Sequence, residues 1–80
     1  MPKLKVLSAK EVQKIFESFG FIAAKQRGSH MKFERIVNGL KQNLTVPNHK
    51  EIDRGTLGAI FRQAVRFMPE NELEKHFYTE

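Results

Sequence analysis

The chain is organised around the stretch Lys25-Gln26-Arg27-Gly28-Ser29-His30-Met31-Lys32-Phe33. Gly28-Ser29 is a turn signal between two runs that pattern as β-strands, so His30 stands where the second strand begins. The positive charges around this histidine come from Lys25, Arg27 and Lys32. Because a histidine side chain titrates near neutrality, such a cluster can both hold a phosphodiester and move a proton.

Two strands are expected to flank this turn, over residues 21–27 and 30–37. In the second strand, a side-chain period of two separates the residues onto two faces. One face carries Met31, Phe33, Arg35 and Val37, and the other carries His30, Lys32, Glu34 and Ile36. If the more apolar face packs against the interior, His30 and Lys32 point to solvent.

The dipeptide Asn38-Gly39 is a strong hairpin signal, because both residues tolerate a positive φ. It predicts a third strand, over residues 40 to about 46, that runs antiparallel to the second. The inward residues of this strand would be Leu44 and Val46, and the outward ones Asn43 and Thr45. Pro47 should end the strand, since it has no N–H to donate to the sheet.

Residues 8–19 are predicted to form the first helix. Ser8 and Glu11 match the capping box, in which each side chain accepts a hydrogen bond from the other residue's backbone N–H. An apolar stripe with helical spacing follows, formed by Val12, Ile15, Phe16 and Phe19. Gly20 can then end the helix in a left-handed conformation.

A second helix is predicted to run from the N-cap Asp53 to about Phe67, before Pro69 breaks it. Its apolar stripe would consist of Leu57, Ile60, Phe61, Ala64 and Met68. Gly58 lies within this helix and costs about 1 kcal/mol relative to alanine. A close approach is therefore expected at Gly58, by a bulky neighbour or alternatively by a ligand.

These elements give the order α-β-β-β-α, followed by a short acidic helix in which Leu73 and Phe77 lie one turn apart. The predicted fold class is α+β, with a three-stranded antiparallel sheet and two helices on one face, as in double-stranded RNA-binding domains. A single domain is expected over residues 1–80, with a core at about 5–68 and an acidic C-terminal tail at 69–80. The layout favours RNA as a partner but carries no information about catalysis.

The composition narrows the classes of protein further. The 80 residues include no cysteine, which excludes disulfides, thiolate metal sites and cysteine nucleophiles and suits a reducing cytoplasm. No apolar run approaches the ~20 residues that span a bilayer, so no membrane association is expected. Neither a metal nor a cofactor is expected, because the histidines and carboxylates lack metal-ligand spacing and so short a chain has no room for a deep cavity.

The net charge of +5 is unevenly distributed along the chain. Residues 1–66 carry 13 of the 14 Lys and Arg and 5 of the 9 acids, which gives +8, whereas residues 67–80 carry 1 base and 4 acids, which gives −3. The basic body favours a polyanionic partner such as nucleic acid, although it could serve solubility alone. The charge split also raises the hypothesis that the acidic tail blocks the basic body in cis.

The turn belongs to a longer set of motifs. The set consists of Ser8-Ala9-Lys10-Glu11-Val12, Gly20-Phe21, Lys25-Gln26-Arg27-Gly28-Ser29-His30, Val46-Pro47 with His49, and Gly55-Thr56-Leu57 leading to Ile60 and Arg62-Gln63-Ala64. With these motifs the sequence resembles the HicA-type toxins, the small messenger-RNA-cleaving ribonucleases of bacterial toxin–antitoxin pairs. The resemblance extends over about residues 5–68.

This resemblance carries several expectations. It implies the double-stranded RNA-binding-domain type of fold, a catalytic role for His30, and a HicB-type antitoxin that covers the active site. It also implies a bacterial cytoplasmic protein that is monomeric alone and hetero-oligomeric with its antitoxin.

The chemistry open to His30 follows from its substrate. RNA supplies its own nucleophile, the 2′-hydroxyl, so an enzyme needs a base, an acid and cations for the phosphate. His30 suits either proton-transfer role, while the adjacent bases Lys25, Arg27 and Lys32 would bind the phosphate together with the amides of Gly28 and Ser29. The second proton-transfer role would fall to His49, a lysine or water, and metal-independent cleavage is predicted.

Other interpretations remain for these residues. His30 could be a strand-end histidine that hydrogen-bonds to the backbone, and His49 could be a loop residue that caps the connection before the second helix. The main alternative function is a non-catalytic RNA-binding module, and a third possibility is a protein that only binds an acidic partner.

Overall fold

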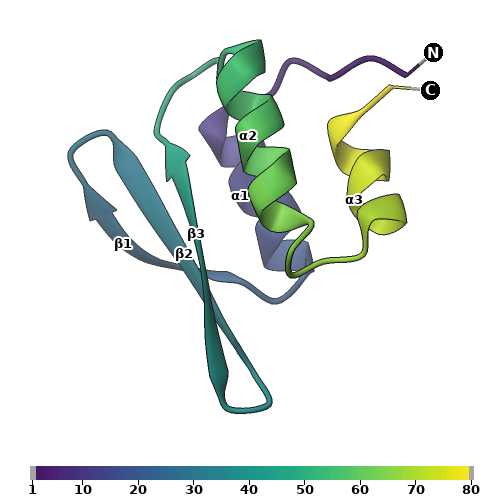
Figure 1. Ribbon diagram of the computed structural model, residues 1–80. Coiled ribbons are helices and arrows are strands. Elements are labelled where there is room, and N and C mark those ends of the chain that lie inside the picture. The colour runs from purple at the N-terminus through teal and green to yellow at the C-terminus, as the bar shows by residue number, and fades with distance from the viewer. Residues whose placement is uncertain (1, 80) are drawn as a thin grey trace.

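The elements follow the predicted order in a computed structural model that describes residues 2–79 (Figure 1). They are α1 (Ala9–Ser18), β1 (Ile22–Arg27), β2 (His30–Val37), β3 (Leu40–Pro47), α2 (Arg54–Ala64) and α3 (Glu70–Phe77). The predicted α+β fold class, with a short helix at the C-terminal end, is confirmed.

The three strands form one antiparallel sheet in the order β1-β2-β3. Strands β2 and β3 pair without a break, from His30 opposite Pro47 to Val37 opposite Leu40. Their connection, Asn38-Gly39, has φ of +53° and +77°, as the predicted hairpin requires.

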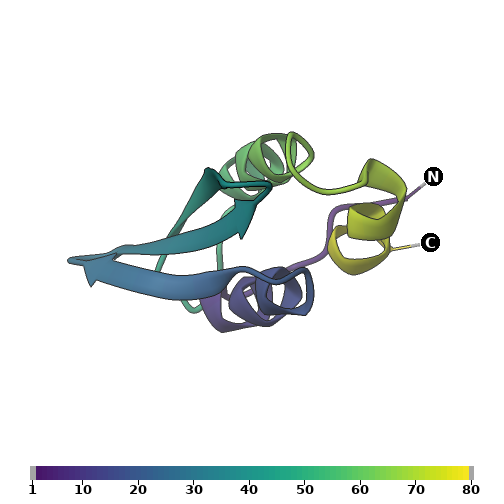
Figure 2. The ribbon, with the colours of Figure 1, turned by 90° about the horizontal axis from the view of Figure 1, so that it is seen from below.

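Helices α1 and α2 lie side by side on one face of the sheet, and the other face is open to solvent (Figure 2). The sheet residues buried beneath the helices are Met31, Phe33, Leu44 and Val46. His30, Lys32, Asn43 and Thr45 are exposed, which confirms the predicted assignment of faces. The hairpin between β2 and β3 extends past the helices, so Val37 is exposed even though it shares the inner face.

The first helix is built as its sequence predicts. The Glu11 N–H donates to Ser8 Oγ at 3.1 Å, and the Ser8 N–H donates to Glu11 Oε1 at 2.9 Å, so both halves of the capping box are present. Val12 and Phe16 are fully buried. The chain leaves the helix through Gly20, whose φ is +95°.

The second helix begins at the predicted cap but ends earlier than predicted. The Thr56 N–H donates to Asp53 Oδ2 at 3.1 Å. The helix stops at Ala64 instead of about Phe67, because the Phe67 N–H turns to the carbonyl of Ala64, three residues back. The Phe67 carbonyl in turn accepts a hydrogen bond from Arg35 Nη2 at 2.8 Å, a tertiary contact that helical periodicity does not reveal.

The expectation of a bulky neighbour at Gly58 is wrong, while the alternative of a ligand there stays a prediction. Outside the helix backbone, a Cβ built at this position would meet only Arg62 Nη1, at 3.5 Å, which is an ordinary contact distance. Gly58 faces a surface hollow and no bulky side chain packs against it among the described residues.

The third helix, α3, packs on the far side of α1 and α2 from the sheet (Figures 1 and 2). Leu73 and Phe77 are fully buried, and the Phe77 ring lies 5.5 Å from that of Phe61, so the hydrophobic core includes residues beyond 68. A β-bridge between Leu4 and Tyr78 ties this helix to the first segment of the chain. The acidic tail is therefore folded against the core on the side away from the basic turn, so it does not cover the turn in cis.

Within residues 2–79, no helix has both the length and the apolar character needed to cross a bilayer.

Candidate functional site

A pocket of about 230 Å³ opens on the outer face of the sheet, near the turn between β1 and β2. It is lined by Lys25, Arg27, His30, Lys32 and Thr45. The strand register brings these residues together, since Arg27 pairs with His30, and Lys32 lies between Lys25 and Thr45. Opposing side chains on one face of a sheet stand about 5 Å apart at Cβ, so the five residues form one contiguous surface.

A β-bulge in β1 gives the pocket two of its bases. The pairing shifts between Ala23 and Lys25, which leaves Ala24 as an extra residue without its own partner. In a regular strand that starts with Ile22 outward, Lys25 and Arg27 would face the helices. The bulge turns both side chains to the face of His30, in keeping with the use of bulges to redirect side chains.

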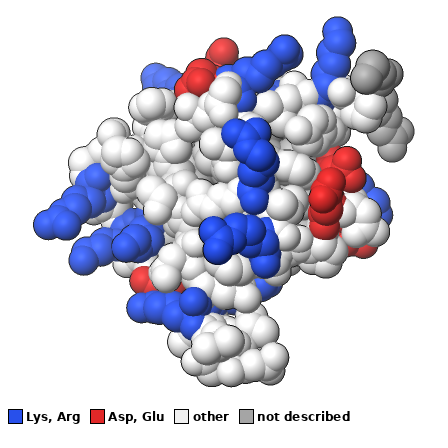
Figure 3. All heavy atoms as spheres, viewed as in Figure 1, with Lys and Arg blue, Asp and Glu red and all other residues white. Residues whose placement is uncertain are grey.

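The positive charge of this pocket is not neutralised within the described residues. The ion pairs found there join Lys41 to Glu34 and Lys75 to Glu72, so the three pocket bases have no carboxylate partner. Figure 3 shows basic side chains spread over the sheet and the adjacent helices, whereas a group of acidic side chains lies over α3. The pocket is therefore suited to an anion.

The His30 side chain is exposed, and it makes no hydrogen bond to any residue from 2 to 79. The alternative of a histidine fixed by the backbone thus has no support in the structure. Both ring nitrogens are free to meet a bound molecule.

Gly28 and Ser29 form the turn beside the pocket and do not line it. Gly28 has a φ of +58°, which a residue with a side chain rarely adopts. The Ser29 carbonyl accepts a hydrogen bond from the Asn48 N–H at 2.5 Å, so the turn is fixed to the loop before α2.

His49 does not join His30 in the pocket. It lines a separate hollow of about 370 Å³ with Ser8, Lys10, Asn48 and Lys50. The Ala9 N–H donates to the His49 carbonyl at 2.9 Å, so this loop is held against the start of α1. The structure therefore unites four predicted site residues and leaves His49 outside their pocket.

Thr45 is a pocket residue that the sequence did not single out. It was expected to face outward, but only the register of β3 shows that it lies opposite Lys32. Its N–H donates to Gln63 Oε1 of α2 at 3.3 Å, which fixes the free edge of β3 at this point. Its hydroxyl adds a neutral donor and acceptor to an otherwise cationic site.

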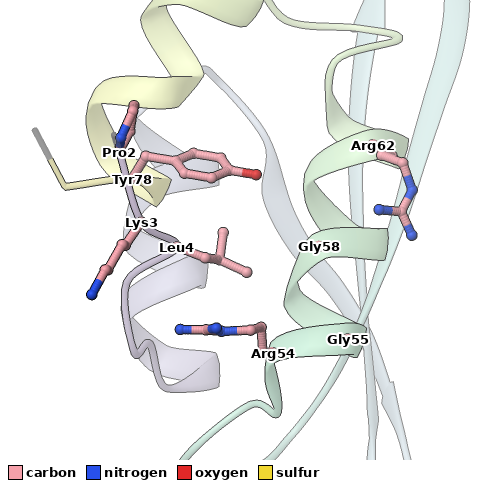
Figure 4. A pocket seen from close by; sticks show the side chains of 8 residues that line it. All are labelled: Pro2, Lys3, Leu4, Arg54, Gly55, Gly58, Arg62 and Tyr78. Atoms are coloured by element: carbon pink, nitrogen blue, oxygen red, sulfur yellow. The ribbon is translucent and has the colours of Figure 1, made fainter.

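A more spacious hollow, of about 500 Å³, lies between α2 and the first described residues of the chain (Figure 4). It is lined by Pro2, Lys3, Leu4, Arg54, Gly55, Gly58, Arg62 and Tyr78. It is basic, but the described residues that line it include neither a histidine nor a carboxylate that could exchange a proton near neutral pH. The His30 pocket is therefore the better candidate for chemistry.

Between residues 2 and 79, no three His, Cys, Asp or Glu side chains come together as metal ligands do.

Comparisons with known proteins identify the family. No curated protein and no solved structure shows significant similarity to the chain. The family model described as the HicA toxin of bacterial toxin-antitoxin systems matches residues 9–65, a range that runs from the start of α1 to just past α2 and includes every residue of the His30 pocket. Because the match covers more than half of the sequence, the resemblance seen in its motifs is confirmed, and the chain belongs to the HicA family of toxins, which act with a cognate antitoxin.

Proposed function

We propose that this toxin is an endoribonuclease that cleaves messenger RNA and uses His30 to transfer a proton. The observation that carries the proposal is the position of an exposed histidine on the open face of the sheet, among three cations that have no acidic partner in the described part of the chain. A phosphodiester bound by these cations would lie against the imidazole ring. Membership of the HicA family supports the same activity.

The reaction needs no nucleophile from outside the RNA. The 2′-hydroxyl attacks the adjacent phosphorus, the bond to the 5′-oxygen breaks, and the products are a 2′,3′-cyclic phosphate and a 5′-hydroxyl. His30 either removes the 2′-hydroxyl proton or donates a proton to the leaving oxygen, and such a transfer typically accelerates a reaction about 10²–10⁴-fold. No metal takes part in this scheme.

The cations act on the charge that develops during the reaction. The phosphorane formed by the attack carries more negative charge on its oxygens than the starting diester does. Lys25, Arg27 and Lys32 would stabilise this charge, and the amides of Gly28 and Ser29 stand at the edge of the pocket where they could add donors.

The second proton-transfer role falls to water, to a lysine of the pocket or to His49. The separate hollow around His49 favours water or a lysine, because a general acid or base must come within hydrogen-bond reach of its proton.

The biological setting follows from the same proposal. The toxin would act on messenger RNA in the bacterial cytoplasm, as a monomer when free. A HicB-type antitoxin would bind it in a hetero-oligomer and cover the His30 pocket.

The test compares the wild-type chain with His30→Ala on an end-labelled RNA in EDTA. Cleavage should fall by at least about 100-fold in the variant, while the far-ultraviolet circular dichroism spectrum stays the same, since His30 is exposed. His76→Ala, which removes a histidine on α3, is the matched control and should cleave like the wild type. An RNA with 2′-deoxyribose at the cleavage position should resist cleavage.

Equal cleavage by His30→Ala and the wild type would refute the catalytic role. Salt-sensitive RNA binding by the wild type without any product would instead show a non-catalytic RNA-binding module.

A further inference from the structure

The outer face of the sheet carries a second feature, at the end opposite the His30 pocket. Ile22 and Ile36 are large apolar residues with exposed fractions of 64% and 70%. Ile22 pairs with Glu34, and Ile36 lies two residues further along β2, so the two isoleucines are diagonal neighbours on one face. Both line a hollow of about 200 Å³, together with Gly20, Glu34 and Arg35. We call this feature the isoleucine hollow.

The isoleucine hollow and the His30 pocket share one continuous surface. His30 and Ile36 are six residues apart on β2, which at about 3.3 Å per residue places them about 20 Å apart. The even spacing puts both side chains on the outer face, which none of the described helices covers. A standard protein interface of about 800 Å² per partner is roughly 30 Å across and therefore spans both features.

The two ends of this surface differ in charge. Of the charged residues that line the isoleucine hollow, Glu34 forms an ion pair with Lys41 at 3.2 Å, and Arg35 donates its guanidinium hydrogens to carbonyl oxygens and to Gln42 Oε1. The pocket end carries three bases that have no acidic partner among residues 2–79. An RNA is bound through free cations and aromatic stacking, whereas the hollow offers two aliphatic side chains, a neutralised ion pair and an arginine whose donors already bind protein acceptors. A protein is the occupant that suits it, because apolar anchors ringed by satisfied polar groups are typical of protein interfaces.

The partner must also be compatible with the cationic end of the same surface. A second copy of this chain carries the same net charge of +5, which disfavours contact between two such faces. A toxin of this family has a cognate antitoxin, and an antitoxin that reaches the pocket must offer negative charge to its three bases.

We infer that the isoleucine hollow is the anchor for the antitoxin, which inserts an apolar side chain there and lays an acidic segment over the His30 pocket. The inference rests on the proposed function in taking that pocket as the site where RNA is cut. Under this inference, RNA cleavage and antitoxin binding depend on different residues of one surface. Residues near His30 serve cleavage, and residues about 20 Å away give the inhibitor much of its affinity. A toxin altered in the hollow should therefore stay active and escape its antitoxin.

The experiment uses the double variant Ile22→Thr/Ile36→Thr. Threonine keeps the β-branched shape that suits a strand but removes apolar surface, and both positions are exposed, so the fold should be retained. Val6→Thr is the matched control, because Val6 is 72% exposed and lies outside the sheet. The probe is the protein encoded by the gene adjacent to that of this chain, and its affinity is measured by calorimetry in parallel with RNA cleavage.

The double variant should bind the antitoxin at least about tenfold more weakly than the wild type, while cleaving RNA at the wild-type rate. Val6→Thr should match the wild type in both assays, and His30→Ala should still bind the antitoxin. Unchanged antitoxin affinity in the double variant would overturn the inference. A wild type that is a dimer in solution, together with a double variant that is a monomer, would also overturn it, because the hollow would then bind a second copy of the chain. If the wild type cuts no RNA, the proposed function fails, but the binding comparison still decides whether the hollow is the anchor.

Discussion

The guanidinium carbon of Arg35 lies 4.6 Å from the centre of the Phe21 ring, stacked on a residue that is itself almost completely buried. The same guanidinium donates to the carbonyls of Phe19 and Phe67, each at 2.8 Å, and to Gln42 Oε1. A single side chain on β2 thus links the end of α1, strand β3 and the turn after α2. A planar group with several fixed donors is needed for this set of contacts.

Replacement of Arg35 by lysine should lower the free energy of unfolding by about 2 kcal/mol, because lysine keeps the charge but cannot serve these acceptors together. Urea unfolding followed by circular dichroism measures the effect. Arg66→Lys, at an exposed arginine, is the control and should leave the midpoint nearly unchanged. Equal midpoints for the two variants would show that the Arg35 contacts do not stabilise the fold.

Deletion of Ala24 should preserve RNA cleavage. Ala24 is the extra residue of the bulge, so its removal leaves Ala23 facing inward and Lys25 outward in a regular strand. Deletion of Gln26, which pairs with Met31, should instead slip the register and greatly reduce cleavage. The prediction fails if loss of Ala24 is as damaging as loss of Gln26.

The double variant Lys25→Ala/Arg27→Ala should bind single-stranded RNA more weakly than the wild type. The slope of log K against the logarithm of the salt concentration should become shallower by up to about 1.4, or about 0.7 for each phosphate that is no longer neutralised. Fluorescence anisotropy over a range of salt concentrations measures both, with His30→Ala as the background so that the RNA stays intact. Arg54→Ala/Arg62→Ala removes the same charge from the hollow beside α2 and should have a smaller effect. A larger effect of the second pair would place the RNA there.

Replacement of His49 by alanine should reduce the rate of cleavage far less than replacement of His30. The reason is that His49 lines a different hollow, outside the pocket where the phosphate would be bound. Single-turnover cleavage by the two variants gives the comparison. Equal losses of about 100-fold or more would identify His49 as the second acid or base.

Substitution of Asp53 by alanine should lower the urea midpoint at neutral pH, since the N-cap of α2 is lost. Hydrogen bonds from Thr56, through its side chain and then its backbone, lower the pKa of Asp53. Because the pKa is lower in the folded state, the stability that the carboxylate adds is present above the ordinary pKa of aspartate and is lost as the pH falls through the lowered value. The difference between wild type and variant should therefore shrink in acid, and a constant difference would contradict this origin.

Local signals explain why most of the fold could be predicted from the sequence. The capping box at Ser8 and the hairpin at Asn38-Gly39 each depend on residues within a few positions, so short patterns are sufficient. The end of α2 could not be predicted, because Arg35 contacts Phe67 from a distant strand. The open space beside Gly58 could not be predicted either, because it depends on how the first described residues pack relative to α2.

The candidate site was predictable in part for the same reason. The bases next to His30 were visible in the sequence, but which face they occupy depends on the bulge at Ala24, and no residue pattern marks it. Thr45 lines the pocket because β3 pairs with β2 in a register that places it opposite Lys32. His49 lies outside the pocket because of the path of the loop before α2.

The bridge between Leu4 and Tyr78, with the hydrogen bond from the Thr79 N–H to the Lys3 carbonyl at 2.7 Å, brings the first and last described segments together. A short linker from residue 79 to residue 3 would therefore close the backbone into a ring without disturbing the sheet. Opening that ring at Asn38-Gly39, an exposed tip, would give a circular permutant with the same fold. One new end would lie on β2, the strand that carries His30 and Ile36, and the other on β3, which carries Thr45, so a dye at either end could report on the arrival of RNA or the antitoxin.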